Sequence, residues 1–164
     1  MLGTIFSVAV DGTEQKTRSS ENPLVEPRFY SAKKKQHSIN ILAVVALDGH
    51  VLYLSPSFSG GSNDSQIFPK VLHHWYPKLE PFEWILADNG FNGFVDQGIR
   101  LTTPGTENKH YRKLHSSLRV IVGNFFARAK TWRTLTNELR VPITEETHLL
   151  NIHNKMWTVV AAFN

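Results

Sequence analysis

Two aspartates occupy the same kind of place in this sequence. Asp11 follows the largely apolar run Ile5–Val10. Asp88 follows the apolar run Trp84–Ala87, and a glycine comes soon after each aspartate. Such runs are typical of buried strands, and if the two strands are neighbours, both carboxylates lie at one end of a sheet. Paired carboxylates suit Mg²⁺ or Mn²⁺, which prefer oxygen ligands and promote phosphodiester cleavage, so the pair predicts a divalent-metal site.

The sequence gives less support to other kinds of functional site, and the aspartates also have structural explanations. An aspartate that follows a strand also caps turns, and this structural explanation stays open for Asp11 and for Asp88 taken singly. Asp64 opens an expected helix, where a carboxylate complements the helix dipole. The histidines show no spacing typical of a zinc site, and the chain has neither a phosphate-binding glycine loop nor a nucleophilic-serine motif.

The elements expected around these aspartates are strands with interleaved helices. Two apolar strands flank Asp48-Gly49, which is typical of a tight hairpin. This order predicts an α/β fold of three layers, in which helices flank one mixed sheet, and a single domain over residues 1–164. The other expected elements are short strands near Phe29-Tyr30 and Arg100–Thr102, and helices after Ser62 through Leu72, over Tyr111–Leu135 and over Glu145–Phe163.

The charge of the chain is positive, at +4, and it is unevenly distributed. No acidic residue lies between Glu107 and Glu138, whereas seven lysines and arginines do. A second basic cluster is Lys33–Lys35. Such clusters are typical either of a solvated surface or of a face that binds a polyanion, and both interpretations stay open.

Composition and segment lengths exclude several classes of protein. The 164 residues include no cysteine, so disulfides and thiolate metal sites are absent. The sequence has no run of about 18 apolar residues, and a membrane-spanning helix is therefore not expected. No basic region precedes the apolar run near the N-terminus, which favours a strand over a signal peptide. We expect an intracellular protein that is not secreted.

The long basic helix has a glycine, Gly123, at its centre. Glycine in a helix interior costs about 1 kcal/mol relative to alanine, so this position requires a reason. Close packing against a neighbouring strand is one explanation, because a glycine lets two backbones approach. A second explanation comes from the order of the motifs.

Five segments occur in a recognisable order: VDGT, FYSAKKKQHSINILAVV, GGSNDSQIF, LADNGF and RVIVGNFFARAK. From Val8 to Asn164 the chain thereby resembles the nuclease domain of DDE-type transposases, and within them the PIF/Harbinger group. The resemblance implies an RNase H-like fold and a divalent cation bound by two aspartates and a glutamate. It also implies that the family reaction is cleavage and strand transfer of DNA.

Carried over by position, the resemblance assigns roles to individual residues. Asp11 and Asp88 match the two catalytic aspartates. Asp64 matches the aspartate of a His-Asp pair whose histidine is replaced here by Asn63. The implied catalytic and metal-binding residues are Asp11, Asp88 and Asp64, and the implied nucleic-acid-binding residues are Lys33, Lys34, Lys35, His37, Arg119 and Lys130.

Gly123 stands where the family has its third metal ligand, a glutamate four residues after the arginine that Arg119 matches. No acidic residue lies in a neighbouring turn that could replace it. Because the loss of one carboxylate weakens metal binding, we expect DNA cleavage to be impaired. The alternatives are a catalytically inactive module that binds DNA or a protein, and a decayed transposon fragment.

The resemblance also implies a cofactor and partners. The cofactor is Mg²⁺ or Mn²⁺, and the partner is DNA, contacted non-specifically through its backbone. No helix-turn-helix region precedes the first catalytic strand in this sequence, so a homo-oligomer or an accessory DNA-binding protein is a further expected partner, and no membrane is expected. The expected location is the nucleus in a eukaryote and the cytoplasm otherwise.

Overall fold

The structure, a computed structural model, describes residues 5–105, 109–141 and 145–163. The chain forms two compact units, each assembled from three segments. Because these segments interleave along the chain, neither unit is a separate stretch of sequence, and the expected single domain over residues 1–164 stays a prediction. Unit 1 comprises Met1–Asp11, Ala43–Tyr53 and Asp64–Phe125, and unit 2 comprises Gly12–Leu42, Leu54–Asn63 and Phe126–Asn164.

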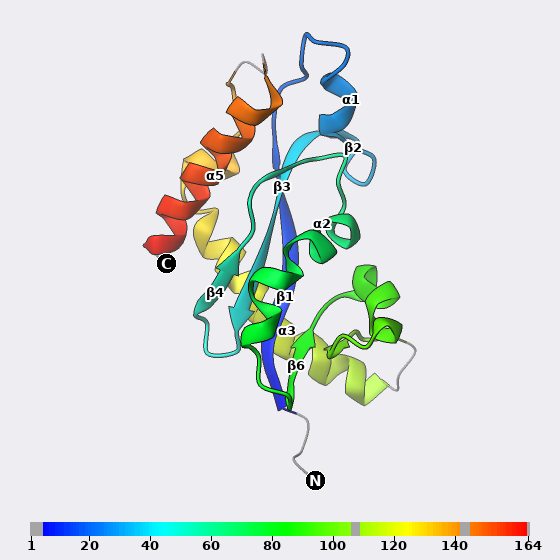
Figure 1. Cartoon of the computed structure of the whole chain (residues 1–164). Coiled ribbons are helices and arrows are strands. Elements are labelled where there is room, and N and C mark those ends of the chain that lie inside the picture. The colour runs from blue at the N-terminus through cyan, green and yellow to red at the C-terminus, as the bar shows by residue number, and fades with distance from the viewer. Residues whose placement is uncertain (1–4, 106–108, 142–144, 164) are drawn as a thin grey trace. The chain divides into compact units, whose positions relative to one another are not determined.

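Seven strands form a sheet with the order β2-β3-β1-β6-β7, and β4 and β5 also pair with β3. Strand β1 is parallel to β6, and β6 is parallel to β7, whereas β3 pairs antiparallel with β2 and with β5. The expected α/β fold with a mixed sheet is therefore confirmed (Figure 1). The strands are β1 (Ile5–Lys16), β2 (Tyr30–Ser31), β3 (Gln36–Ala46), β4 (Val51–Leu54), β5 (Phe58–Ser59), β6 (Glu83–Leu86) and β7 (Leu101–Thr102).

The three expected helices lie where they were predicted, except at the end of the long basic helix, and two short helices, at Glu26–Phe29 and Arg133–Thr136, were not predicted. Helix α3 ends at Ala129, and Trp132 has an extended backbone (ψ 118°), so the predicted continuation to Leu135 is wrong. The N–H of Trp132 reaches back only three residues, to the carbonyl of Ala129 (3.2 Å), which tightens and closes the last turn. The helices are α1 (Glu26–Phe29), α2 (Asp64–Val71), α3 (Lys109–Ala129), α4 (Arg133–Thr136) and α5 (Glu146–Ala162), and the 3₁₀ helices are η1 (Leu72–His74), η2 (Tyr76–Lys78) and η3 (Asn89–Gln97).

Strand β1 is longer than the sequence pattern indicates. It continues through Asp11 and Gly12 to Lys16, so the predicted strand end and turn at Asp11-Gly12 are wrong. An Asp-Gly pair permits a turn but does not require one where the backbone has strand partners. Such a partner is distant in sequence, because the N–H of Leu139 donates to the carbonyl of Lys16 (2.9 Å).

The hairpin expected at Asp48-Gly49 is confirmed within unit 1. The N–H of Ala46 donates to the carbonyl of His50 (2.8 Å), which closes the connection between β3 and β4. Gly49 has a φ of +99°, in the region that favours glycine. The Asp-Gly signal therefore produces a turn here.

Each unit has buried apolar residues on its own strands and helices. In unit 1 the buried residues are consecutive in both strands, Val8–Val10 in β1 and Ile85–Leu86 in β6, and α3 buries Val122 and Phe125. In unit 2 a core cluster joins Phe29, Ile39, Leu139 and Leu149. Helix α5 buries one helical stripe, which consists of Leu149, His153, Trp157 and Val160.

Candidate active site

Asp11 and Asp88 lie at corresponding distances from the paired segment of two neighbouring parallel strands, Asp11 within β1 and Asp88 just after the end of β6. The register of β1 and β6 pairs Ala9 with Leu86. Asp11 comes two residues after Ala9, and Asp88 comes two residues after Leu86. The sequence interpretation required the two strands to be neighbours, and β1 and β6 are neighbours in the sheet (Figure 1). Both aspartates follow the paired segment at its carboxyl end.

Asp88 caps the helix that follows it. Its Oδ1 accepts a hydrogen bond from the N–H of Gly90 (2.9 Å) at the start of η3. A Cβ on Gly90 would lie 2.9 Å from the same oxygen, so only glycine allows this close approach without displacement. The turn-capping explanation is correct for one oxygen of Asp88, and the carboxylate retains a second oxygen for other chemistry.

Asp11 forms an ion pair with helix α3. The Nη1 of Arg119 lies 3.0 Å from the Oδ2 of Asp11, and each side chain is only about a quarter exposed, at 27% and 26%. The pair is partly shielded from water, so it is held more firmly than a surface ion pair. Arg119, assigned to nucleic acid by the resemblance, here neutralises the first candidate metal ligand.

Gly123 lies one helical turn after Arg119, and residues four apart share a helix face. Gly123 is exposed, and an added Cβ would meet no atom of the described residues within 4 Å. Its φ is not positive, so the backbone does not require glycine. The close-packing explanation for Gly123 is therefore wrong, and the position has room for a larger side chain.

The described residues do not assemble a complete metal site. Asp64 is half-buried at the start of α2. No group of three or more His, Asp or Glu side chains within residues 5–105, 109–141 and 145–163 is placed to hold a metal ion. Two aspartates with an arginine on one of them do not fit a full divalent-cation site, so we derive no catalytic step through a metal. The metal-binding role of Asp64 stays a prediction.

One buried histidine near this site has no counterpart in the sequence interpretation. His115 precedes Arg119 by one helical turn, is 2% exposed, and its Nε2 lies 3.1 Å from the carbonyl of Thr102. Burial lowers the pKa of His115, and the charge of Arg119 lowers it further against the opposing hydrogen bond to Thr102. The spacing of four from Arg119 is the only sequence signal that could have placed His115 on this face.

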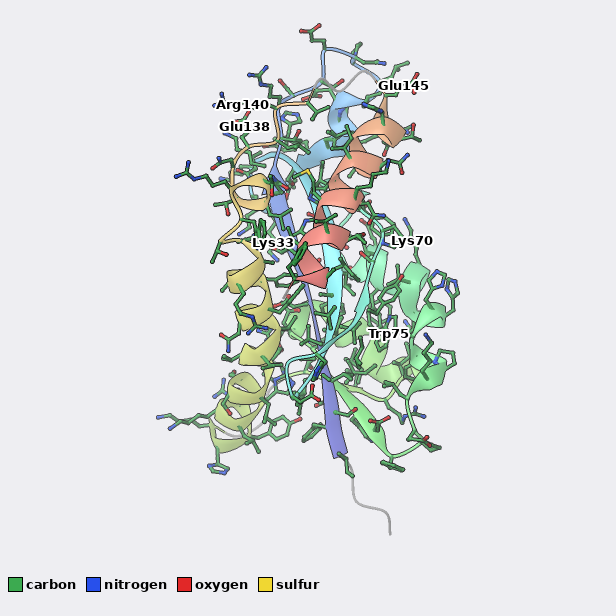
Figure 2. The ribbon with its side chains drawn as sticks, turned by 90° about the vertical axis from the view of Figure 1, so that its left-hand side faces the viewer. Lys33, Lys70, Trp75, Glu138, Arg140 and Glu145 are labelled. Carbon is green, nitrogen blue, oxygen red and sulfur yellow. The ribbon has the colours of Figure 1, made fainter. Side chains whose placement is uncertain are left out.

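The other expected nucleic-acid contacts differ in accessibility. Lys33, Lys34 and Lys35 are exposed on the turn between β2 and β3, and Figure 2 labels Lys33 on it. His37 is held by Glu26, with its Nε2 2.5 Å from Oε1. The Nζ of Lys130 donates to the carbonyl of Glu14 (3.3 Å). Burial lowers the pKa of Lys130, and the charge of Lys34 lowers it further.

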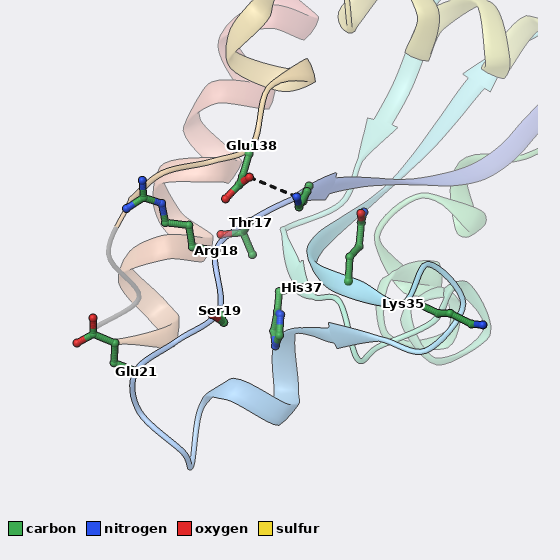
Figure 3. A pocket seen from close by; sticks show the side chains of 9 residues that line it. Thr17, Arg18, Ser19, Glu21, Lys35, His37 and Glu138 are labelled. Atoms are coloured by element: carbon green, nitrogen blue, oxygen red, sulfur yellow. Dashed lines mark ion pairs between the residues drawn. The ribbon is translucent and has the colours of Figure 1, made fainter.

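A polar pocket in unit 2 brings two of these basic residues together. It has a volume of about 660 Å³, and Lys35 and His37 contribute to its wall (Figure 3). Lys16 and Arg18 add positive charge, but Lys16 is paired with Glu138 (3.4 Å). Because acidic and basic side chains share this wall, we do not assign the pocket to a polyanion. Its remaining lining residues are Thr17, Ser19, Glu21 and Gln36.

The fold is an α/β fold with a mixed sheet, and a family comparison assigns its class. The profile of the DDE superfamily endonuclease family matches residues 10–163, and the chain belongs to that family. Its members typically depend on divalent metal ions, and the family implies DNA as the substrate. Comparisons with curated proteins and with solved structures found no match.

The helices give no sign of a membrane-spanning segment. In the part of the chain that the structure describes, none is both long enough and apolar enough to cross a bilayer.

Proposed function

We propose that this chain is a transposase-derived nuclease domain of the PIF/Harbinger type in which DNA cleavage is impaired by the missing carboxylate at position 123. The observation that carries the proposal is the place of Gly123, one turn after the arginine that reaches Asp11. The five motifs in family order support the finer PIF/Harbinger assignment. The same order supports Asp64 as a further acidic residue of the site.

Position 123 can accept the missing side chain. Apart from the adjoining backbone of α3, no atom of the described residues lies within 4 Å of an added Cβ on Gly123, and the position is exposed, so a side chain can begin there without a clash. Side chains four residues apart on a helix are neighbours, so this glutamate would lie beside Arg119. Through Arg119 it would also lie close to Asp11, where a third metal ligand is needed.

The net charge of the site also supports the proposal that a carboxylate is missing at position 123. Asp11, Asp88 and Arg119 together leave one net negative charge, because the guanidinium neutralises one carboxylate. A divalent cation is held by several carboxylate oxygens, and one net charge attracts it weakly. A glutamate at position 123 would add a negative charge and would compete with Asp11 for Arg119.

Metal affinity tests the proposal without depending on catalysis. We expect Gly123→Glu to bind Mn²⁺ at least tenfold more tightly than the wild type, measured by electron paramagnetic resonance of unbound Mn²⁺. Gly123→Gln is the matched control, because it has the same length and similar helix propensity but no charge. Equal Mn²⁺ affinity of the Glu and Gln variants would show that position 123 is not the third ligand position.

Nicking of supercoiled plasmid in Mn²⁺ tests the functional consequence. We expect no nicking by the wild type or by Gly123→Gln, and nicking by Gly123→Glu that is lost when Asp88→Asn is added. Nicking by the wild type that depends on Asp88 would contradict the proposed impairment. Failure of a tightly Mn²⁺-binding Gly123→Glu to nick would show that the glycine is not the only defect.

A second candidate function is a module that binds DNA without cleaving it. The observation that favours it is the exposure of all three lysines on the turn between β2 and β3. Lysine side chains on such a turn contact phosphates as point charges, which requires no metal and no glutamate. This function agrees with a nuclear location in a eukaryote, and that location stays a prediction. The specificity for a DNA sequence would come from accessory partners or from a homo-oligomer.

A further inference from the structure

Three large apolar side chains lie together on the surface of unit 2. Trp132 lies between α3 and α4, and its ring stacks on the ring of Phe163, with a centroid distance of 6.1 Å and an interplanar angle of 29°. Val159 of α5 lies four residues before Phe163, whose backbone stays helical (φ −100°, ψ 0°), so these two residues share a helix face. We call the three residues the α5 patch, after the helix whose red end appears in Figure 1.

All three side chains of the α5 patch are exposed. Trp132 is 46% exposed, Val159 is 56% exposed and Phe163 is 74% exposed. Single exposed apolar side chains are ordinary, whereas a contiguous group of them marks a surface that another molecule covers. Helix α5 buries a different stripe, which includes Leu149 and Trp157, so the packing of unit 2 does not require these apolar residues.

The segments that form the α5 patch carry no negative charge. No aspartate or glutamate occurs over residues 109–137 or over residues 147–163. Glu146 and the residue before it lie more than three helical turns before Val159. Glu138 is paired with a lysine near the start of the chain (3.4 Å). These segments therefore provide no carboxylate that could balance a cation beside the patch.

Three exposed cations lie close to the α5 patch along the chain. Arg128 and Arg133 are within four residues of Trp132. Lys155 lies one turn before Val159, on the same face of α5. None of the three cations forms an ion pair with another described residue. Charge complementarity therefore favours a negatively charged partner at this surface.

The distribution of charge along α5 favours a protein over a nucleic acid. Residues 156–163 are uncharged, and the cation of this face, Lys155, lies at the border of that segment. An apolar centre with a polar rim is typical of protein interfaces, whereas interfaces with nucleic acid are much more positively charged. A second copy of this chain is disfavoured, because its own cations would face the same cations of the first copy.

We propose that the α5 patch docks an acidic amphipathic helix of a partner protein. The apolar face of that helix would cover the three exposed side chains, and its carboxylates would pair with the nearby arginines and lysine. This interaction goes beyond the proposed nuclease function, because it involves neither the aspartates nor position 123.

A designed peptide tests the proposal. The probe is a fluorescein-labelled helix of about 15 residues with leucine and phenylalanine on one face and glutamate on the other. We expect saturable binding in fluorescence anisotropy. One control peptide has lysine in place of every glutamate, and a second has alanine in place of every leucine and phenylalanine, which keeps the helix. Each control should bind about tenfold more weakly, because it lacks the charge or the apolar anchors.

Substitutions at exposed positions locate the binding surface. Val159→Thr combined with Phe163→Gln should weaken the glutamate peptide about tenfold, because the apolar anchor sites are lost. Leu24→Gln is the matched control, since Leu24 is 81% exposed elsewhere in unit 2, and it should leave the affinity unchanged. In ¹⁵N-labelled protein the peptide should shift the indole N–H signal of Trp132, which Trp132→Phe identifies. Amide spectra report whether each variant is folded.

Charge variants test the role of the nearby cations. Neutralising all three in one variant should weaken the glutamate peptide several-fold and reduce the dependence of its affinity on salt. The substitutions are Arg128→Gln, Arg133→Gln and Lys155→Gln. A control variant loses the same total charge from exposed positions of unit 1 and should bind nearly as the wild type does. Its substitutions are Lys78→Gln, Arg112→Gln and Lys113→Gln.

Several results would overturn the proposal. One is the absence of saturable binding of the glutamate peptide, and another is equal affinity for the glutamate and lysine peptides. Equal loss in Leu24→Gln and in the Val159→Thr, Phe163→Gln variant would also contradict it. Single-stranded oligothymidylate that binds in place of the peptide, and loses affinity in the same double variant, would assign the patch to nucleic acid. None of these results bears on Mn²⁺ binding at position 123, so the two proposals fail independently.

Discussion

The guanidinium of Arg119 lies 3.0 Å from the carboxylate of Asp11, across 108 residues of sequence. This contact places a positive charge beside Asp11, the first candidate metal ligand. It also shows which face of α3 is turned toward Asp11. Gly123 lies on that face one turn later. The pair therefore links the candidate site to the position at which the family's third carboxylate is missing.

Removing the guanidinium should strengthen metal binding. We expect Arg119→Gln to bind Mn²⁺ about fivefold more tightly than the wild type, because a partly screened competing charge contributes about 1 kcal/mol. Isothermal titration with Mn²⁺ measures the change. Arg112→Gln removes an exposed charge from the same helix and should alter affinity much less. An equal effect of both variants would show that the Asp11 contact is not the cause.

Gly123 and Gly60 should respond in opposite ways to alanine. We expect Gly123→Ala to raise the free energy of unfolding by about 1 kcal/mol, because it is an exposed helix position with open space around the new Cβ. Gly60→Ala should lower it by about 1–3 kcal/mol, because the Cβ would meet Ser38 and would lie 2.6 Å from the carbonyl of Phe29. Urea denaturation of both variants is the measurement. A destabilised Gly123→Ala would mean that the glycine has a packing role.

The buried His153 should make unit 2 sensitive to acid. Its Nδ1 lies 2.7 Å from the Oγ of Ser57, and its Nε2 accepts from the indole N–H of Trp157 (3.1 Å). Because the indole can only donate, the ring proton is on Nδ1 and donates to Ser57. His153 is therefore neutral, and Ser57 is not an activated nucleophile in this arrangement.

Burial lowers the pKa of His153 from 6.5 to about 3. The unfolded chain therefore binds more protons below about pH 6.5, and stability falls as the pH drops from 6.5 toward 3. We expect this residue alone to remove about 4 kcal/mol of unfolding free energy by pH 3. His153→Gln should flatten the dependence measured by denaturation at several pH values, and His148→Gln, at an exposed position, should not. Identical pH profiles for the two variants would contradict the assignment.

The lysines of the β2–β3 turn should contribute to DNA retention. We expect Lys33→Ala, Lys34→Ala and Lys35→Ala together to weaken duplex binding and to reduce the slope of affinity against salt by about 2–3 charges. Filter binding at several salt concentrations measures both quantities. The control removes three other exposed cations, Arg133, Arg140 and Lys155. Equal loss in the two triple variants would show that net charge, and not this turn, governs binding.

Local patterns predicted the main strands and helices and singled out the two aspartates, whose catalytic role stays a prediction. Apolar runs predict β1 and β6 because strand propensity and burial act over a few residues, and the Asp48-Gly49 turn follows from its own backbone preference. The motif order also identified the family, which the profile match over residues 10–163 confirms. The same Asp-Gly signal failed at Asp11-Gly12, because distant strand partners hold that backbone extended.

Only the tertiary structure determined which side chains distant in sequence are in contact. The contact of Arg119 with Asp11 and the open space at Gly123 depend on how α3 lies beside β1, which no local pattern specifies. The bulge at Ser7 is a register difference between β1 and β6, which are far apart in sequence. Sequence therefore determined most of the elements and the chemical inventory, whereas non-local packing determined which charged groups are paired.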